Sequence, residues 1–402
     1  MNKKISLGAA IAFMLVVATV TLALTMAFSM NRFTTMVNGV QQQRELYSKL
    51  TEIEQQVRDK YPDAIDNDKL MDSMAAGYIS GLGEDGGKYY TADDYQKLVN
   101  SEEGRYYGVG IVPMMEPSGY IQVKEVYPDS PASNAQIVVG DLIVKVDDID
   151  VAAETYEQAV ALLQGDAGTK VNLTVRRENE DISMEITRRQ VEIPTVYARN
   201  FDRVGYMRIT SFTTGTRDQV NRQLNQAINS SLDALVIDLR DNVGGRYSAM
   251  APALELLVPE GDMILAKYKS AEPVVLAESD SSGVGFPLVV LVNNNTAGTA
   301  EVFAQVLKDM AGARVVGVKT VGDGKLQEFV KLSDGSAIQL TVARYVTPGG
   351  TVIDGEGVKP DYDVALESDS INWDNMDPEF DSQLKKALEV AQSSINLESA
   401  AQ

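Results

Sequence analysis

Apolar and polar positions follow a helical period near the start of the chain. Between Phe33 and Val57 apolar residues recur at steps of three or four, which predicts a helix that ends before Pro62. One apolar stripe of this kind fits a coiled-coil dimer stem and a helix packed on its own domain equally well. A second helix is predicted over 70–82, closed by glycines at 81 and 83.

An alternating period begins at Gly104 and predicts a β-rich module. Short runs at 171–175 and 182–186 alternate apolar and polar residues, as half-buried strands do. A helix is predicted from Thr155 to Leu163, before these two strands.

Strands and helices alternate from Arg199 onward. Strands are predicted at 204–209, 232–240 and 288–293, and helices at 216–229 and 247–257. This alternation implies a parallel or mixed sheet covered by helices. Ligands of such sheets gather at the carboxyl ends of the strands, where residues 242–245 and 293–299 fall. A last helix, from Asp381 to Ala391, is expected to be a solvated terminal helix.

The N-terminus predicts a membrane anchor. Lys3 and Lys4 precede a stretch without charge from Ile5 through Asn31, and about 20 apolar residues suffice to span a bilayer. Lysines before this stretch and a mainly acidic body after it place the N-terminus in the cytoplasm and the body outside. A cleaved signal peptide with a site near 27–29 is the alternative, but cleavable apolar cores usually run about 7–15 residues.

Composition narrows the chemistry further. The chain has no cysteine and no histidine, so disulfides, thiolate catalysis, histidine-dependent triads and His-ligated zinc are excluded. A serine or threonine with a lysine base is one of the few hydrolytic schemes left. The formal net charge of -21 argues against nucleic-acid binding and against docking on an anionic lipid surface. We expect no cofactor and no metal.

Two motifs resemble the catalytic segments of the carboxyl-terminal processing peptidases, a family of serine/lysine proteases with an inserted PDZ domain. The strand-to-helix turn of that family reads Thr-Ala-Ser-Ala-Ser-Glu, and this chain has Thr-Ala-Gly-Thr-Ala-Glu over 296–301. The later loop of the family reads Thr-Phe-Gly-Lys-Gly, and this chain has Thr-Val-Gly-Asp-Gly over 320–324. The resemblance extends roughly from Met71 to Asp361.

The resemblance implies α/β architecture plus a β-rich module. Together with the transmembrane helix and the helical segment predicted from the residue pattern, it gives a PDZ domain and a ClpP/crotonase-like α/β peptidase core. The implied boundaries are 1–31 for the signal anchor, 32–103 for the helical region, 104–190 for the PDZ domain, 191–366 for the peptidase-like domain and 367–402 for the C-terminal helix and tail.

The same resemblance implies that the reacting groups are missing. Gly298 stands where the family has its nucleophilic serine, and Asp323 stands where it has its general-base lysine. Glycine supplies no oxygen to attack a carbonyl, and aspartate reverses the charge of the base. The remaining implied site residues are the lysine-orienting Gln327, and the oxyanion donors Thr299, Gly244 and Gly245.

The PDZ resemblance implies a peptide-binding loop at Tyr107, Gly108, Val109, Gly110 and Ile111. Backbone N–H groups of such a loop cradle a C-terminal carboxylate, and the neighbouring strand edge accepts the peptide as an added strand. We therefore expect peptide or protein C-termini as partners.

Two substitute chemistries stay open. Thr296 or Thr299 would act with Lys325, although both substitutes are displaced along the chain from the family's positions. Without such a role we expect Thr296 to cap the following helix and Lys325 to be an exposed surface lysine. Alternatively, Asp323 would activate a water in the space opened by Gly298, but an acid partner is then lacking.

Three functions follow from these observations. The leading one is a pseudoprotease that binds peptide C-termini or extended segments as an adaptor or regulator. It would sit in a bacterial cell membrane by a single span, with its body at the cell surface or in the periplasm, as a homodimer or beside an active paralogue. The second is an active endopeptidase with substitute groups, and the third is a scaffold that binds nothing.

Overall fold

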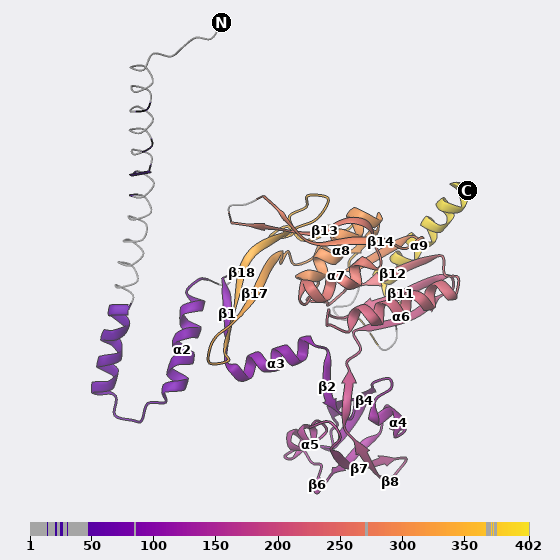
Figure 1. Ribbon diagram of the computed structural model, residues 1–402. Helices are drawn as coiled ribbons and strands as arrows, with labels where there is room; N and C mark the ends of the chain where they lie inside the picture. Colours follow the sequence, from indigo (N-terminus) through magenta and orange to yellow (C-terminus); the bar gives the residue numbers. More distant parts are fainter. Residues whose placement is uncertain are drawn as a thin grey trace. The chain divides into compact units, whose positions relative to one another are not determined.

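The computed structural model describes residues 47–402, except 84–85, 270–271, 367–370, 372, 374–375 and 402, together with residues 14, 21, 25, 26 and 30 (Figure 1). The chain forms two compact units, Met1–Met71 and Asp72–Gln402. None of the helices built by described residues has the length and apolar character that a bilayer-spanning segment needs. The predicted anchor over 1–31 falls outside the described residues, apart from the five isolated positions.

Helices dominate the segment before the β-rich module. Residues 47–60 are helical, as far as the predicted N-terminal helix is described, and the chain turns before Pro62. Helix α2 (Asn67–Ser80) corresponds to the second predicted helix and starts three residues earlier. A short strand β1 (Gly87–Tyr90) and helix α3 (Ala92–Glu102) follow, and Thr91 caps α3 by accepting from the Asp94 N–H at 3.2 Å.

The β-rich module is a small antiparallel sheet with its own core. Its strands are β3 (Ile111–Met115), β4 (Ile121–Val126), β5 (Leu142–Val146), β6 (Ile149–Asp150), β7 (Lys170–Arg177) and β8 (Glu180–Thr187). Helices α4 (Pro131–Asn134) and α5 (Tyr156–Leu162) cover it (Figure 1). Strands β2 (Arg105–Gly108) and β9 (Arg189–Glu192) pair with each other where the chain enters and leaves the module. Alternate residues such as Val171, Leu173 and Val175 are fully buried, as the alternating pattern predicts.

A six-stranded mixed sheet forms the centre of the second half of the chain. Its order is β10 (Val196–Phe201), β11 (Val204–Ile209), β12 (Ala234–Asp238), β15 (Leu288–Val292), β16 (Arg314–Gly317) and β19 (Tyr362–Asp363). Only β10 runs antiparallel to its neighbour. Helices α6 (Thr216–Asn229), α7 (Tyr247–Glu255) and α8 (Thr299–Ala311) lie between these strands in sequence.

Both faces of this sheet are buried, so its strands are apolar at successive positions. Leu235 and Ile237 face the core that α6, α7 and α8 share with the sheet. Val236 and Leu291 face the opposite side, where they pack with residues of α9 (Ser382–Ala401). The predicted solvated terminal helix is therefore wrong, because one side of α9 completes a hydrophobic core.

An antiparallel sheet extends from the helix-covered side. Its strands are β13 (Pro259–Tyr268), β14 (Val274–Ser282), β17 (Lys325–Lys331) and β18 (Ala337–Val346), joined by β1. Strand β18 pairs with β1, β13 and β17. Because β17 follows the 320–324 loop directly, this sheet sets where that loop lies.

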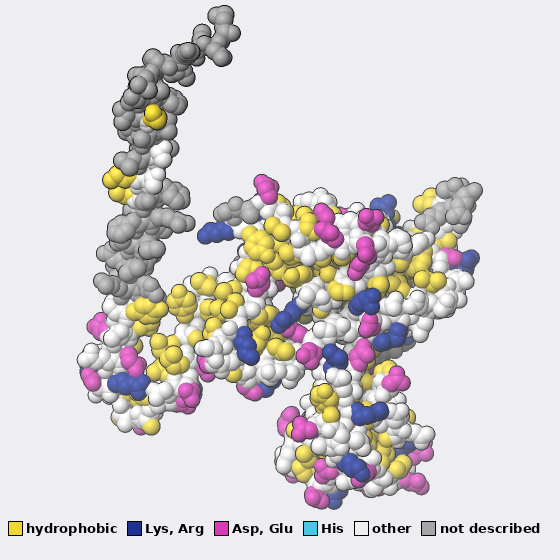
Figure 2. Space-filling view, viewed as in Figure 1, with side chains coloured by type: hydrophobic (Ala, Val, Ile, Leu, Met, Phe, Trp, Pro, Cys, Tyr) yellow, Lys and Arg dark blue, Asp and Glu magenta, His cyan; other side chains and the backbone are white. Residues whose placement is uncertain are grey.

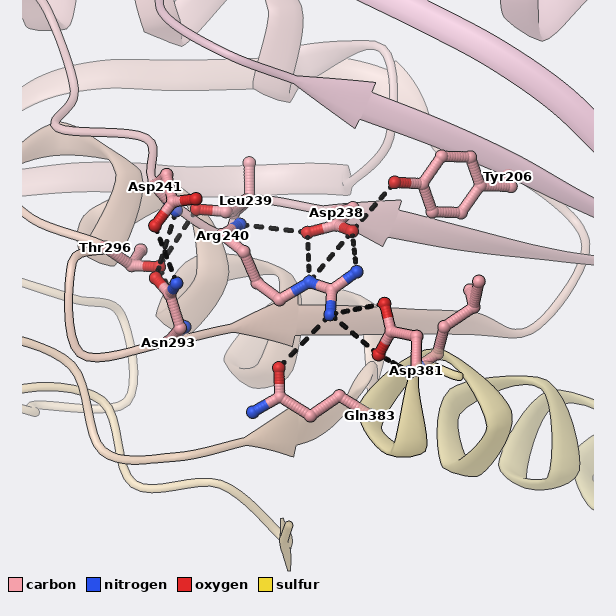
Figure 3. Close-up of polar contacts among 10 residues, drawn as sticks. Tyr206, Asp238, Leu239, Arg240, Asp241, Asn293, Thr296, Asp381 and Gln383 are labelled. Atoms are coloured by element: carbon pink, nitrogen blue, oxygen red, sulfur yellow. Dashed lines mark hydrogen bonds and ion pairs between the residues drawn. The ribbon is translucent and has the colours of Figure 1, made fainter. Parts of the chain in front are cut away.

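A buried ion network fastens α9 to the end of β12 (Figure 3). The Arg240 guanidinium, fully buried, binds the Asp238 carboxylate at 2.6 Å and Asp381 at 2.9 Å. It also donates to Gln383 at 3.2 Å, and the Tyr206 hydroxyl donates to Asp238 at 2.8 Å. On the surface, the exposed acidic side chains are spread over the face drawn in Figure 2 and do not form a single patch.

A candidate active-site cleft with its reacting groups replaced

A sharp turn carries Gly298 between β15 and α8. Its backbone has φ 60° and ψ -131°, a left-handed conformation that residues with a side chain adopt only under strain. Strained strand-to-helix turns of this kind expose the nucleophile in other hydrolases. Gly298 keeps the backbone of such an elbow and supplies no reacting atom.

A neighbouring turn after β12 holds this elbow. The Thr296 hydroxyl donates to the Leu239 carbonyl at 2.9 Å, and the Ala297 N–H donates to the Asn242 carbonyl at 3.0 Å. The expected helix cap at Thr296 is thus wrong, because α8 starts at Thr299 and the Thr296 side chain bonds to the adjacent turn. Parallel pairing of β12 with β15 brings the two turns together.

The predicted oxyanion donors lie side by side, and one of them is already engaged. The Gly244 N–H donates to the Asn242 side-chain oxygen at 2.7 Å. A Cβ on Gly244 would lie 2.8 Å from the Thr299 nitrogen, so only glycine permits this approach. The N–H groups of Gly245 and Thr299 have no hydrogen-bond acceptor among the described residues.

Glu301, in the first turn of α8, joins the elbow to the loop that carries Asp323. The buried carboxylate accepts from the Gly298 N–H at 3.0 Å. It also accepts from the N–H groups of Gly322 at 2.7 Å and Asp323 at 2.8 Å, and from the Thr320 hydroxyl. Burial raises the pKa of the Glu301 carboxyl, and the four donors oppose that rise.

Asp323 is paired with Lys325 rather than exposed alone. The Asp323 carboxylate lies 3.3 Å from the Lys325 ammonium, and the Lys325 side chain is only 20% exposed. The expectation of an exposed surface lysine at 325 is therefore wrong. Both side chains line the cleft.

Gln327 lies on β17 in the same cleft but does not bond to Asp323 in the structure. Its side-chain oxygen accepts from Gln339 at 2.7 Å, and its amide donates to Thr341 at 3.4 Å. The resemblance implies that Gln327 orients a catalytic lysine, but position 323 is an aspartate, so Gln327 has no lysine there to orient.

The cleft around these residues encloses about 900 Å³ and has a mixed polar and aromatic lining. Tyr90 and Tyr95 of the N-terminal segment and Phe329 of β17 form its aromatic wall. Arg246, directly after the oxyanion turn, stacks on Phe329 at 4.7 Å from the ring centre and binds Glu102 at 2.5 Å. A cleft of this volume is within the range of ligand-binding pockets.

The geometry disfavours the substitute chemistry in which a threonine acts with Lys325. The Thr299 hydroxyl donates to the Gly245 carbonyl at 3.1 Å, so it is not directed at a base. The Lys325 side-chain nitrogen lies 3.3 Å from the Asp323 carboxylate, whereas a general base must be directed at the nucleophile whose proton it takes. No cluster of histidine, cysteine, aspartate or glutamate suited to a metal occurs among the described residues.

Residues of the predicted peptide loop, Tyr107–Ile111, lie at the junction of β2 and β3. Only Tyr107 is exposed, at 48%, and the other four are buried. The Val109 N–H already donates to the Leu163 carbonyl at 3.1 Å.

Sequence reasoning missed two cleft features. Glu301 was used only as a residue that matches the family motif, although its carboxylate accepts hydrogen bonds from Gly298 and Asp323. Arg246 was not considered, and its place directly after Gly245 was the available signal.

Comparisons with known proteins agree with the motifs. A model of peptidase family S41 matches residues 203–364, and a PDZ domain model matches residues 122–177. The carboxy-terminal processing protease CtpA of Bacillus subtilis is 30% identical over 317 residues, which is 78% of this chain and 68% of that protein. The carboxy-terminal-processing protease of Bartonella bacilliformis is 27% identical over 332 residues, covering 81% and 76%.

Among solved structures, a Bacteroides fragilis protein described as an S41 protease superposes with a TM-score of 0.51 at 18% identity. The match covers 83% of this chain and 92% of that one, and it supports the fold alone.

Proposed function

The chain belongs to peptidase family S41 and carries the family's PDZ domain, and we propose that it is a member that binds polypeptide chains without cleaving them. One observation carries the proposal. The cleft and the strand-to-helix turn are both present, but residue 298 has no side-chain hydroxyl and residue 323 has no side-chain amine. An oxyanion hole without nucleophile and base retains about 10³–10⁴-fold over water, too little for a working peptidase.

The related proteins are named as carboxy-terminal processing proteases, which suggests that the ligand of this chain is the carboxyl-terminal end of a polypeptide. A polypeptide end bound in this cleft would meet the aromatic wall, the N–H groups of Gly245 and Thr299, and the Arg246 guanidinium. Such a protein would act as an adaptor or regulator that holds chains.

The membrane anchor and the partners remain part of the proposal. Residues 5–30 would anchor the chain in a bacterial cell membrane with the body outside the cytoplasm, as the two preceding lysines indicate. Exposed apolar side chains on α2, Met71, Met74 and Tyr78, support contact with a second copy or an active relative.

The first experiment measures cleavage and binding together. The full-length protein in detergent is incubated with a pool of unstructured peptides, and turnover and anisotropy are recorded. We expect binding without turnover in the parent, and turnover in the double variant Gly298→Ser with Asp323→Lys. A Cβ at 298 would lie 3.1 Å from the Val243 carbonyl, so the new serine requires a shift of a few tenths of an ångström and a strained backbone at φ 60°.

One further variant and one further outcome interpret the result. Parent turnover that disappears in Thr299→Ala would contradict the proposal and select a threonine-based peptidase. If the parent protein neither binds nor cleaves the peptides, the proposal is contradicted and the scaffold hypothesis is favoured.

A matched pair locates the binding. Val243 lines the cleft and is 72% exposed, so Val243→Trp narrows the cleft without touching the core. Val321 is 54% exposed on the neighbouring loop and does not line the cleft, so Val321→Trp is the control. We expect Val243→Trp alone to reduce peptide affinity by at least tenfold, equivalent to about 1.4 kcal/mol.

A further inference from the structure

The carboxylate-binding loop of the PDZ domain is closed in this chain. A PDZ loop captures a peptide end with consecutive backbone N–H groups, here those of Val109, Gly110 and Ile111. All three residues are buried, with Val109 only 1% and Ile111 only 5% exposed. The first of the three N–H groups bonds within the protein, to the Leu163 carbonyl at 3.1 Å.

The segment after α5 covers the same side of the loop. The Gly165 N–H donates to the Tyr107 carbonyl at 3.2 Å, and Gly108 forms an isolated antiparallel bridge with Gln164. A carboxylate that used the Val109 N–H would have to break this pairing.

The Tyr106 side chain lies over the rest of the loop. A Cβ on Gly108 would lie 2.6 Å from the Tyr106 ring, so ring and loop are in direct contact. The other side of the ring meets Tyr127 edge-on at 6.5 Å, and the Tyr127 N–H donates to the Gly110 carbonyl at 3.0 Å.

The N–H groups of Gly110 and Ile111 face the Tyr106 hydroxyl closely enough to oppose the rise of its pKa. Burial raises the pKa of Tyr106 to about 12 despite these two donors, so the hydroxyl is neutral in physiological conditions. A neutral oxygen of the protein thus occupies the place of a peptide carboxylate oxygen.

The open edge of the groove has also lost a donor. Strand β3 pairs with β4 alone among the described strands, and Pro113 is opposite Val123. The backbone of Val123 bonds to Asp141 and Gly140, away from β3, so the backbone of Pro113 faces the open edge. Proline has no N–H, and an added peptide strand would find no donor at this position.

We infer that Tyr106 is a resident occupant of the carboxylate-binding loop and that, with Pro113, it closes the PDZ groove of this chain to peptide C-termini. The cleft is then the polypeptide-binding site, a consequence that rests on the proposed function. Closure of the groove itself does not depend on what the cleft binds.

Hydrogen exchange tests the closure without any ligand. In the full-length protein, we expect the Gly110 and Ile111 amides to exchange slowly because the Tyr106 hydroxyl, as their inferred acceptor, protects them. Tyr106→Phe removes the oxygen and keeps the ring, so both amides should exchange at least about tenfold faster, the effect of a hydrogen bond worth about 1.4 kcal/mol. Tyr107→Phe alters the exposed neighbouring tyrosine and should leave both rates unchanged. Equal rates in the parent and Tyr106→Phe would overturn the inference.

Peptide binding tests the consequence. The probe is a fluorescein-labelled unstructured decapeptide ending in valine, as free acid and as C-terminal amide, with Val243→Trp present to narrow the cleft. We expect less than twofold preference for the acid with the native groove, and about tenfold or more after Tyr106→Phe with Pro113→Val, because charged acceptors form the stronger bonds. A tenfold preference for the acid with the native groove would contradict the inference, even if the cleft binds peptides.

Discussion

At the scale of single residues, glycine and aspartate occupy the two positions that align with the family's catalytic serine and lysine, and the surrounding hydrogen bonds hold both positions in place. Gly298 retains an elbow backbone that glycine adopts without the strain a serine would bear. Glu301 bonds to the N–H groups of Gly298 and Asp323, so one buried carboxylate sets the distance between the two positions that align with the family's nucleophile and base. Selection on polypeptide binding would preserve this frame without the chemistry.

Replacing Glu301 with glutamine tests its support of both segments. Glutamine offers one acceptor oxygen in place of two and turns an NH₂ group toward backbone donors. We expect the core unfolding transition to lose about 1–3 kcal/mol, the cost of leaving buried donors unpaired. Hydrogen exchange at Gly322 should accelerate as well.

The control for this change is Glu356→Gln. Glu356 is exposed and pairs with Lys359 at 3.2 Å, so its loss should not move the core transition. Equal effects of the two substitutions would show that Glu301 does not hold the loop.

At the scale of elements, the C-terminal helix is fastened to the turn that carries the oxyanion donors. Arg240 immediately precedes Asp241–Gly245 in the chain, and its guanidinium binds Asp381 at the start of α9 (Figure 3). Leu384, Ala387 and Ala391 of α9 are fully buried against the sheet. The helix thus supports the cleft from the opposite face of the sheet.

Asp381→Asn separates the charge of this residue from its capping role. The Asp381 carboxylate accepts from the Leu384 N–H at 2.9 Å, and asparagine caps helices equally well. We expect a loss of about 1.5–3 kcal/mol in the core transition, because a buried bond to a charged guanidinium is weakened.

Asp381→Ala should cost about 1 kcal/mol more than Asp381→Asn, because it also removes the cap. The control is Lys386→Ala, whose pair with Glu389 lies on the exposed side of α9. A core transition that Asp381→Asn leaves unmoved would contradict the role of the ion network.

At the scale of the whole molecule, the PDZ domain and the peptidase core have separate hydrophobic clusters. Leu173 belongs to the PDZ cluster, whereas Leu291 belongs to the cluster shared by the central sheet and α9. Links between the two parts include the β2–β9 pair and a hydrogen bond from Tyr197 to Glu125 at 3.2 Å. Domains with separate cores generally unfold as separate units.

Calorimetry of the full chain should therefore show two transitions. Leu173→Ala should lower only the PDZ transition and Leu291→Ala only the core transition, each by about 2–5 kcal/mol for a buried leucine. A shift of both transitions in either variant would mean that the two parts unfold as one cooperative unit.

Local patterns in the sequence determined most elements and the family. The apolar period predicted helix 216–229 and strand 204–209 with the bounds that the structure has, because each is set by neighbours in the chain. The motifs around 298 and 323 predict that the family's catalytic serine and lysine are replaced, because the sequence itself shows glycine and aspartate at these positions. The family resemblance is confirmed by the comparisons.

Only the tertiary structure decided which groups are already engaged. The Tyr106 hydroxyl on the PDZ loop, the pairing of Lys325 with Asp323, and the burial of α9 all depend on the geometry that folding gives the chain. A sequence pattern shows that a side chain is polar or apolar, but not which partner folding brings within bonding distance. The sequence thus determined that glycine and aspartate stand at the two aligned catalytic positions, and the fold decided which neighbouring groups they and the PDZ loop contact.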